Sequence, residues 1–136
     1  MRILFLCTGN TCRSQMAEGW TNELAQNNVE VISAGIGTHG QNKHAIDAMA
    51  EVGIDISEQQ SIRVNGEMLE WADLLVTLCD TAEQHCLVFH PHTTRLHLPM
   101  PDPAKKKGSK QEIQTEFGQA RDQLKRRVNY VLEHIN

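Results

Sequence analysis

A cysteine, an arginine and a serine stand at a spacing that suits the capture of and attack on a tetrahedral oxyanion. The segment Cys7–Ser14 reads Cys-Thr-Gly-Asn-Thr-Cys-Arg-Ser, the pattern C-x5-R-[ST]. Successive backbone N–H groups of such a loop can surround an anion, and Arg13 offers a planar fork to two of its oxygens. The same positive surroundings favour the thiolate form of Cys7. A thiolate beside a captured oxyanion is placed for nucleophilic attack.

Every residue after the cysteine in this loop is a candidate ligand of the anion. We expect the substrate to be held by Thr8, Gly9, Asn10, Thr11, Cys12, Arg13 and Ser14. Ser14 is expected to cap the helix that follows and to donate a hydrogen bond to the thiolate, and Cys12 to be a small packing residue. The plainer interpretation is a buried cysteine ahead of an ordinary helix cap. The strand before the loop and the helix after it favour the oxyanion loop.

The elements around the loop place it where α/β proteins bind ligands. Ile3–Leu6 is an apolar run typical of a buried parallel strand, and helical spacing of apolar residues begins at Ser14. Further strands are predicted at 29–34, 73–79 and 94–98, and further helices at 45–52, at 68–72 and after the capping box of Ser109 and Glu112. This alternation predicts an α/β fold: a single three-layer domain over residues 1–136, with a four-stranded parallel sheet flanked by helices.

Composition and charge argue against several classes of protein. The 136 residues carry 13 basic and 17 acidic side chains, a net charge of −4, which argues against nucleic acid as a partner. The longest apolar runs are far shorter than the roughly 20 residues that cross a bilayer, and the short apolar N-terminus does not read as a signal peptide. We therefore expect a monomeric cytoplasmic protein with neither nucleic-acid nor membrane partners.

Four cysteines, Cys7, Cys12, Cys79 and Cys86, need an explanation in a reducing compartment. Their spacings, C-x4-C and C-x6-C, differ from the C-x2-C usual in structural zinc sites, so no metal or other cofactor is expected. A helix over 79–86 would separate its two cysteines by about 10.5 Å along the axis, whereas a disulfide needs Cα atoms within about 7 Å. This segment is therefore expected to be a loop, or to unwind when a bridge forms. Two unrelated buried cysteines are the alternative.

The loop resembles the phosphate-binding loop of low-molecular-weight protein tyrosine phosphatases. The longer run Cys7–Trp20 is more similar still to the thioredoxin-coupled arsenate reductases that share that fold. Other stretches agree in order along nearly the whole chain: Ser33-Ala34-Gly35, Val76-Thr77-Leu78-Cys79 with Cys86, and Asp102-Pro103-Ala104. The resemblance implies a low-molecular-weight tyrosine phosphatase fold. It also implies reduction of arsenate to arsenite in arsenic detoxification, with phosphate or sulfate as mimics of the substrate and thioredoxin as the reductant.

The resemblance also implies an order of reaction. Cys7 attacks arsenate, with Asp102 in its Pro-Asp-Pro turn as the general acid. Cys79 then attacks Cys7, arsenite leaves, and a Cys7–Cys79 disulfide remains. Cys86 attacks Cys79, which forms a Cys79–Cys86 disulfide and frees Cys7. The residues by themselves supply only the parts, namely a thiolate in an anion loop and a separate pair of cysteines.

Two other functions stay open at this point. A phosphatase would use Cys7, Arg13 and Asp102 alone, although Ala104 and the lysines 105–107 stand where aromatic walls would hold phosphotyrosine. An oxyanion-sensing or redox-interaction module would bind without turnover. The lysine run is expected either to be solvated or to raise the local concentration of the anion.

Some relatives bind a monovalent cation near the loop, and the resemblance extends to Asn10, Glu18 and Ser33. The segment 61–63 lacks the acidic side chain that would complete such a site. A cation is therefore not assigned.

Overall fold

The computed structural model describes residues 1–26, 28–89 and 94–135, and of residues 85–89 it describes the backbone alone. Its four strands form one parallel sheet in the order β2-β1-β3-β4. The strands are β1 (Arg2–Cys7), β2 (Glu30–Gly35), β3 (Leu74–Thr77) and β4 (Arg95–His97). The helices are α1 (Arg13–Leu24), α2 (Lys43–Ala50), α3 (Gly66–Trp71), α4 (Asp80–Phe89) and α5 (Lys110–His134), with a 3₁₀ turn η1 (Pro103–Lys105). The predicted α/β class and parallel sheet are confirmed.

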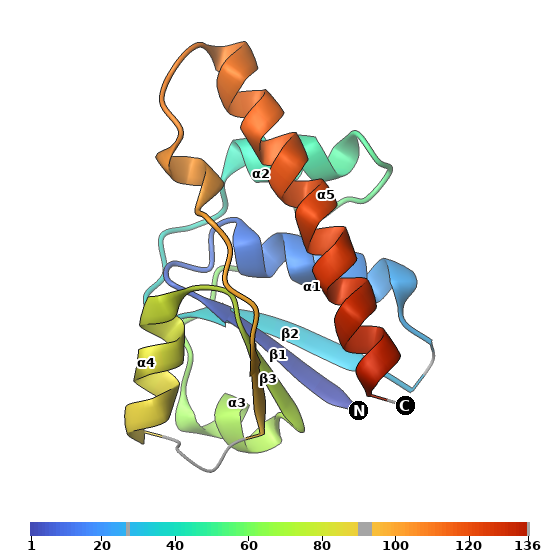
Figure 1. Cartoon of the computed structure of the whole chain (residues 1–136), viewed down its shortest axis with the longest axis vertical. Helices are drawn as coiled ribbons and strands as arrows, with labels where there is room; N and C mark the ends of the chain where they lie inside the picture. The colour runs from blue at the N-terminus through green and yellow to red at the C-terminus, as the bar shows by residue number, and fades with distance from the viewer. Residues whose placement is uncertain (27, 90–93, 136) are drawn as a thin grey trace.

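The sheet lies between two layers of helices, with α1, α2 and α5 on one side and α3 and α4 on the other (Figure 1). Strand β1 is paired on both edges, with β2 and with β3. Its residues from Ile3 to Cys7 are at most 3% exposed. A strand buried on both faces needs apolar side chains at every position, which explains why this part of the sequence is an unbroken apolar run.

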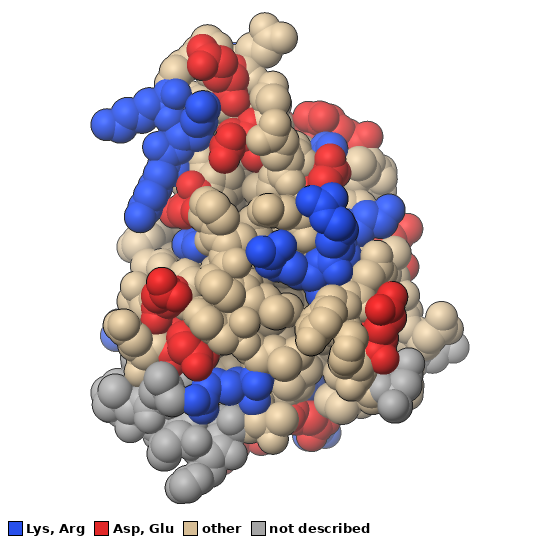
Figure 2. Space-filling model, viewed as in Figure 1, with Lys and Arg blue, Asp and Glu red and all other residues tan. Residues whose placement is uncertain are grey.

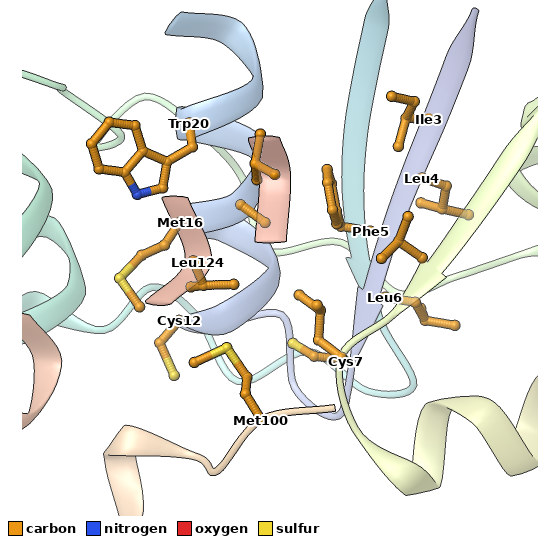
Figure 3. Packing of buried hydrophobic residues seen from close by; sticks show 14 of the residues in the cluster. Ile3, Leu4, Phe5, Leu6, Cys7, Cys12, Met16, Trp20, Met100 and Leu124 are labelled. Carbon is orange, nitrogen blue, oxygen red and sulfur yellow. The ribbon is translucent and has the colours of Figure 1, made fainter. Parts of the chain in front are cut away.

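Helix α5 holds α1 against the sheet. Met16 and Trp20 of α1 pack with Leu124 of α5, and Cys7, Cys12 and Met100 close the same core at its lower end in the view (Figure 3). The Trp20 indole N–H donates to the Arg121 carbonyl at 2.9 Å. Helix α5 begins at the predicted capping box, in which the Ser109 hydroxyl accepts from the Glu112 N–H. The start of α1, and with it the end of the loop, is thereby held in place.

The segment that follows Cys79 is a helix. Helix α4 begins at Asp80 and includes the backbone of Cys86, so the expectation of a loop is wrong for this state. No proline or glycine interrupts the segment, and Asp80 and Glu83 place negative charge in the first turn, where the helix dipole favours it. The second alternative of the prediction remains: α4 has to unwind if Cys79 and Cys86 are to form a disulfide. The side chain of Cys86 lies outside the described part of the structure.

Within the described ranges, no helix combines the length and apolarity needed to span a membrane.

Candidate active site

The loop from Cys7 to Arg13 joins the end of β1 to the start of α1, at the edge where the carboxyl ends of the strands meet. Parallel α/β sheets bind their ligands at that edge. Because β3 runs parallel beside β1, Cys79 leaves the sheet next to Cys7. The Thr8 Oγ1 atom lies 3.2 Å from the Cys79 Sγ atom. The fold thus places Cys79 in contact with the residue that directly follows Cys7.

The carbonyl groups of the loop point outward. Four of them accept hydrogen bonds of 2.9–3.2 Å from backbone N–H groups of residues 36–42, namely those of Cys7, Thr8, Gly9 and Thr11. The Asn10 carbonyl accepts from Gln15 Nε2 at 2.8 Å. In a planar trans peptide the next N–H points opposite to the carbonyl, so the N–H groups turn to the inside of the loop. Inward N–H groups beside the N-terminus of a helix are suited to binding an anion.

Asn10 shapes the middle of this loop. Its φ of 49° lies in the left-handed region, which asparagine tolerates better than most residues with a side chain. The side chain is fully buried, and its Nδ2 atom donates at 3.4 Å to the carbonyls of Ser33, Gln60 and Ile62. On the same side, Gly35 permits close packing, because a Cβ atom there would come within 2.6 Å of the Asn10 nitrogen. The loop is therefore held from behind by neighbouring backbone.

Ser14 connects Asn10 with the nucleophile. Its Oγ atom lies 2.9 Å from Cys7 Sγ and donates to Asn10 Oδ1 at 2.7 Å. A hydroxyl has one proton, so a Cys7 thiol donates to Ser14, whereas a thiolate requires the Ser14 proton to turn toward sulfur. The predicted capping role of Ser14 is wrong, since α1 begins at Arg13 and its N-cap, Cys12, makes no side-chain cap.

The guanidinium of Arg13 is buried and its Nε donor is unpaired among the described residues. Arg13 is 6% exposed, and its Nη1 atom donates to the carbonyls of Leu78 and Met100 at 3.4 and 3.0 Å. Its Nε atom is buried and has no partner among the described residues. An unpaired buried donor costs about 1–3 kcal/mol, which an anion in the loop would recover.

Replacing Arg13 by lysine tests this assignment. Lysine keeps the charge but loses the planar fork, and a hydrogen bond to a charged group contributes about 1.5–3 kcal/mol. We expect the affinity for inorganic phosphate, measured by calorimetry, to fall about 10–100-fold. The exposed Arg126 of α5 provides the matched control, and an equal loss in Arg126→Lys would contradict the assignment.

Asp102 and Cys12 meet at the other side of the loop. Asp102 Oδ1 accepts from the Ala104 N–H at 3.0 Å and lies 3.6 Å from Cys12 Sγ, while Oδ2 lies 3.8 Å from Arg13 Nη2. Burial, with smaller contributions from Asp102 and Cys7, raises the pKa of Cys12 to about 11. Cys12 is therefore a thiol at neutral pH that donates to Asp102.

A cleft of about 490 Å³ opens over the loop, and its walls include Thr8, Arg13, Cys79, Asp102 and Lys105. Lys105 is exposed at the end of η1. The lysine-rich segment between η1 and α5 projects basic side chains at the upper left of the view in Figure 2. Lys105 therefore places one positive charge on the wall of the cleft.

Asn10, Glu18 and Ser33, the residues that resemble the cation site of some relatives, are joined by direct hydrogen bonds. Ser33 Oγ donates to Glu18 Oε1 at 2.7 Å, and burial raises the pKa of Glu18. Three or more His, Cys, Asp or Glu side chains are nowhere grouped as metal ligands in the part of the chain that the structure describes. These contacts give no ground for assigning a cation.

Two features of the site were missed from the sequence. The Gly9-Asn10 pair was an available signal for the left-handed residue, because asparagine is enriched at positive φ. The contact between Thr8 and Cys79 had no local signal, since it depends on which strands are neighbours.

A buried cysteine at the end of a central parallel strand, followed by an N–H-lined loop and a buried arginine, defines a class of proteins that hold a tetrahedral oxyanion beside a thiol. Residues 2–136 match the family described as "Low molecular weight phosphotyrosine protein phosphatase". The chain belongs to that family, which confirms the resemblance seen in the sequence.

The curated relatives include arsenate reductases. That of Oceanobacillus iheyensis is 48% identical over 126 residues, which are 93% of this chain and 91% of the relative. That of Bacillus subtilis is 46% identical over 131 residues, 96% of this chain and 94% of the relative.

Solved structures share the fold over nearly the whole chain. An arsenate reductase in the phosphate-binding state superposes with a TM-score of 0.80 at 31% identity, covering 99% of this chain and 98% of the other. The YwlE arginine phosphatase of Geobacillus stearothermophilus superposes with a TM-score of 0.85 at 26% identity, covering 97% and 90%. Both reductases and phosphatases therefore occur on this fold.

Proposed function

We propose that this chain reduces arsenate to arsenite, with Cys7 as the nucleophile and with Cys79 and Cys86 as the thiols that take up the oxidation. The observation that carries this proposal is the Cys79 thiol in the wall of the oxyanion cleft, 3.2 Å from Thr8 Oγ1. A phosphatase needs one nucleophilic thiol, whereas a two-electron reduction needs two thiols that can become a disulfide. Relatives named arsenate reductase, at 46–48% identity, support the same function.

In the first step the Cys7 thiolate attacks arsenic and an As–S bond forms. One arsenate oxygen leaves as water, and Asp102 at the cleft supplies a proton to it. The inward N–H groups and the free Arg13 Nε atom hold the remaining oxygens. The Ser14 hydroxyl holds the Cys7 sulfur in position by a hydrogen bond before the attack.

In the second step the Cys79 sulfur attacks the Cys7 sulfur. An S–S bond forms, the S–As bond breaks, and its electron pair stays on arsenic, which passes from As(V) to As(III) and leaves as arsenite. The balance is one arsenate and two thiols converted to one arsenite, one disulfide and one water.

In the third step the Cys86 thiolate attacks Cys79, so that a Cys79–Cys86 bond forms and Cys7 leaves as a thiolate. Seven residues of helix rise about 10.5 Å, and a disulfide needs Cα atoms within about 7 Å, so α4 has to unwind first. The new disulfide is then reduced by a dithiol protein, which is itself oxidised. We propose thioredoxin for this role, in the reducing cytoplasm.

The alternative is a phosphatase that uses Cys7, Arg13 and Asp102 alone. The charge of the cleft favours the reductase, because the exposed Lys105 on its wall suits a compact anion better than an aryl group. Phosphate and arsenate share their tetrahedral shape, so slow hydrolysis of a phosphomonoester remains compatible with the site.

The Cys79→Ser variant separates the two functions. We expect it to release no arsenite above the uncatalysed background, because no second thiol displaces arsenite from Cys7. Hydrolysis of p-nitrophenyl phosphate should stay within about twofold of the wild-type rate, since it needs only Cys7, Arg13 and Asp102. Arsenite is measured after one turnover without thioredoxin. Release of arsenite by the variant at the wild-type rate would rule out the proposed cascade.

A further inference from the structure

Four side chains outside the cleft come from the elements before and after Cys79 in the sequence. Thr77 lies on β3 just before it, Glu83 in the first turn of α4 just after it, and Arg95 and His97 on β4. We call these four residues the Glu83 clamp. They join three elements of the fold around a single carboxylate.

The carboxylate of Glu83 is the centre of the clamp. Thr77 Oγ1 donates to Glu83 Oε2 at 2.9 Å, and Arg95 Nε donates to Glu83 Oε1 at 3.0 Å. His97 places Nδ1 2.8 Å from Thr77 Oγ1 and Nε2 3.0 Å from Asp80 Oδ1. The Glu83 and Arg95 side chains are only 18% and 20% exposed, so water screens this pair less than an open surface pair. Burial acts to raise the pKa of Glu83, but the Arg95 and Thr77 hydrogen bonds and the nearby positive charges lower it overall.

The clamp holds the turn that touches the sulfur of Cys79. The Ala82 N–H donates to Cys79 Sγ at 3.4 Å, and the Glu83 N–H donates to the Cys79 carbonyl at 3.2 Å. Both donors point at Cys79 only while the first turn of α4 is wound. Thr8 contacts the same sulfur from the loop. The wound turn therefore keeps the sulfur at the cleft, where Cys7 is to be attacked.

The same contacts oppose the later exchange. Glu83 lies between Cys79 and Cys86 in α4, and this helix has to unwind before the two cysteines can be bridged. Unwinding withdraws Glu83 from Thr77 and Arg95. The clamp therefore favours the state in which Cys79 attacks Cys7 and disfavours the state in which Cys86 attacks Cys79.

We propose that Glu83 is a positioning residue that sets the balance between the two disulfide exchanges, speeding the first and slowing the second. This inference rests on the proposed three-cysteine reaction. In the first exchange the Cys7–Cys79 bond forms while the bond from Cys7 to arsenic breaks. In the second the Cys79–Cys86 bond forms, Cys7 leaves as a thiolate, and no net oxidation occurs.

The test measures the two exchanges separately in Glu83→Gln. The first is read as arsenite release in a Cys86→Ser background by rapid quench. The second is read in the chain with all cysteines present, as conversion of Cys7–Cys79 to Cys79–Cys86, by acid quench, alkylation and peptide mass spectrometry. We expect the first to slow and the second to accelerate, each about three- to tenfold, the size expected for one partly buried charged hydrogen-bond pair.

Two further variants sharpen this test. Glu70→Gln makes the same charge change at an exposed position of α3 and should alter neither rate. Arg95→Lys retains a cation beside Glu83 and should shift both rates less than Glu83→Gln does. Because a general loss of structure would also unwind α4, the opposite changes count only if Glu83→Gln binds inorganic phosphate as tightly as the wild type does, measured by calorimetry. Unchanged rates, or changes in the same direction, overturn the inference.

A measurement without arsenate separates this inference from the proposed function. Hydrogen exchange of the backbone amides of residues 80–84 in the reduced chain should be faster in Glu83→Gln than in Glu70→Gln. Unchanged hydrogen exchange at these amides would show that Glu83 does not hold the first turn of α4, which overturns the inference. Absence of arsenite release by the wild-type chain overturns the proposed function instead.

Discussion

We expect the Cys7→Ser variant to release no arsenite above the uncatalysed background, although it differs from the wild type by a single atom. A serine hydroxyl is a much weaker nucleophile than a cysteine sulfur, and an oxygen in its place cannot form the disulfide that carries the two electrons away. The rest of the loop keeps its outward carbonyls and its Arg13 donor. Binding of inorganic phosphate should therefore persist, and calorimetry on the same sample shows whether the variant has folded.

The matched control is Cys12→Ser, in the same loop. Burial raises the pKa of Cys12 to about 11, so this cysteine is a thiol at neutral pH and not a nucleophile. Serine can replace its donation to Asp102 Oδ1, and arsenite release should stay within about threefold of wild type. Loss of release in the Cys12 variant, with retention in the Cys7 variant, would transfer the nucleophilic role to Cys12.

The order of the strands limited what could be predicted about the site. An apolar run, a helical spacing and a capping box are local patterns, so β1 and the start of α5 were predicted within one or two residues. Local patterns do not show that β3 lies beside β1. The pairing of β1 with β3 places Cys79 against Thr8. The sequence therefore supported three reactive cysteines but did not show that Cys79 lies beside the loop.

The wrong expectation for Ser14 has a physical cause. A hydroxyl at the start of a helix is usually a cap, which occupies a free N–H group of the first turn. On the proposed function, the start of α1 meets the bound anion, for which free N–H groups are needed. The hydroxyl bonds to Asn10 and lies against Cys7 instead.

The state of residues 79–86 could not be chosen from their sequence. Disulfide geometry allowed a loop or a helix that unwinds, and the acidic first turn favours the helix. Thr77, Glu83 and Arg95, which hold that helix to the sheet, come from three separate elements. A clamp of this kind becomes visible only when the fold is known.

Cys86→Ser is expected to release one equivalent of arsenite per chain and then to stop, even with excess arsenate and an active thioredoxin system. Without Cys86 the second exchange is absent, so the chain remains as the Cys7–Cys79 disulfide. In the folded chain Cys7 is 3% and Cys79 is 9% exposed. A protein reductant must bring its own thiolate to one of these sulfurs, and their burial prevents that approach. In the proposed reaction the wild type avoids this end point by moving the disulfide to Cys79 and Cys86, which requires α4 to unwind.

Counting arsenite against the chain concentration checks this result. Mass spectrometry of the stalled chain should show a loss of about 2 Da and a peptide that joins Cys7 to Cys79. Cys12→Ser serves again as the control and should turn over repeatedly, because Cys12 takes no part in either exchange. Repeated turnover by Cys86→Ser would show that thioredoxin reaches the buried bridge directly. The unwinding of α4 would then be unnecessary, and the pairing of Cys79 with Cys86 would have to be given up.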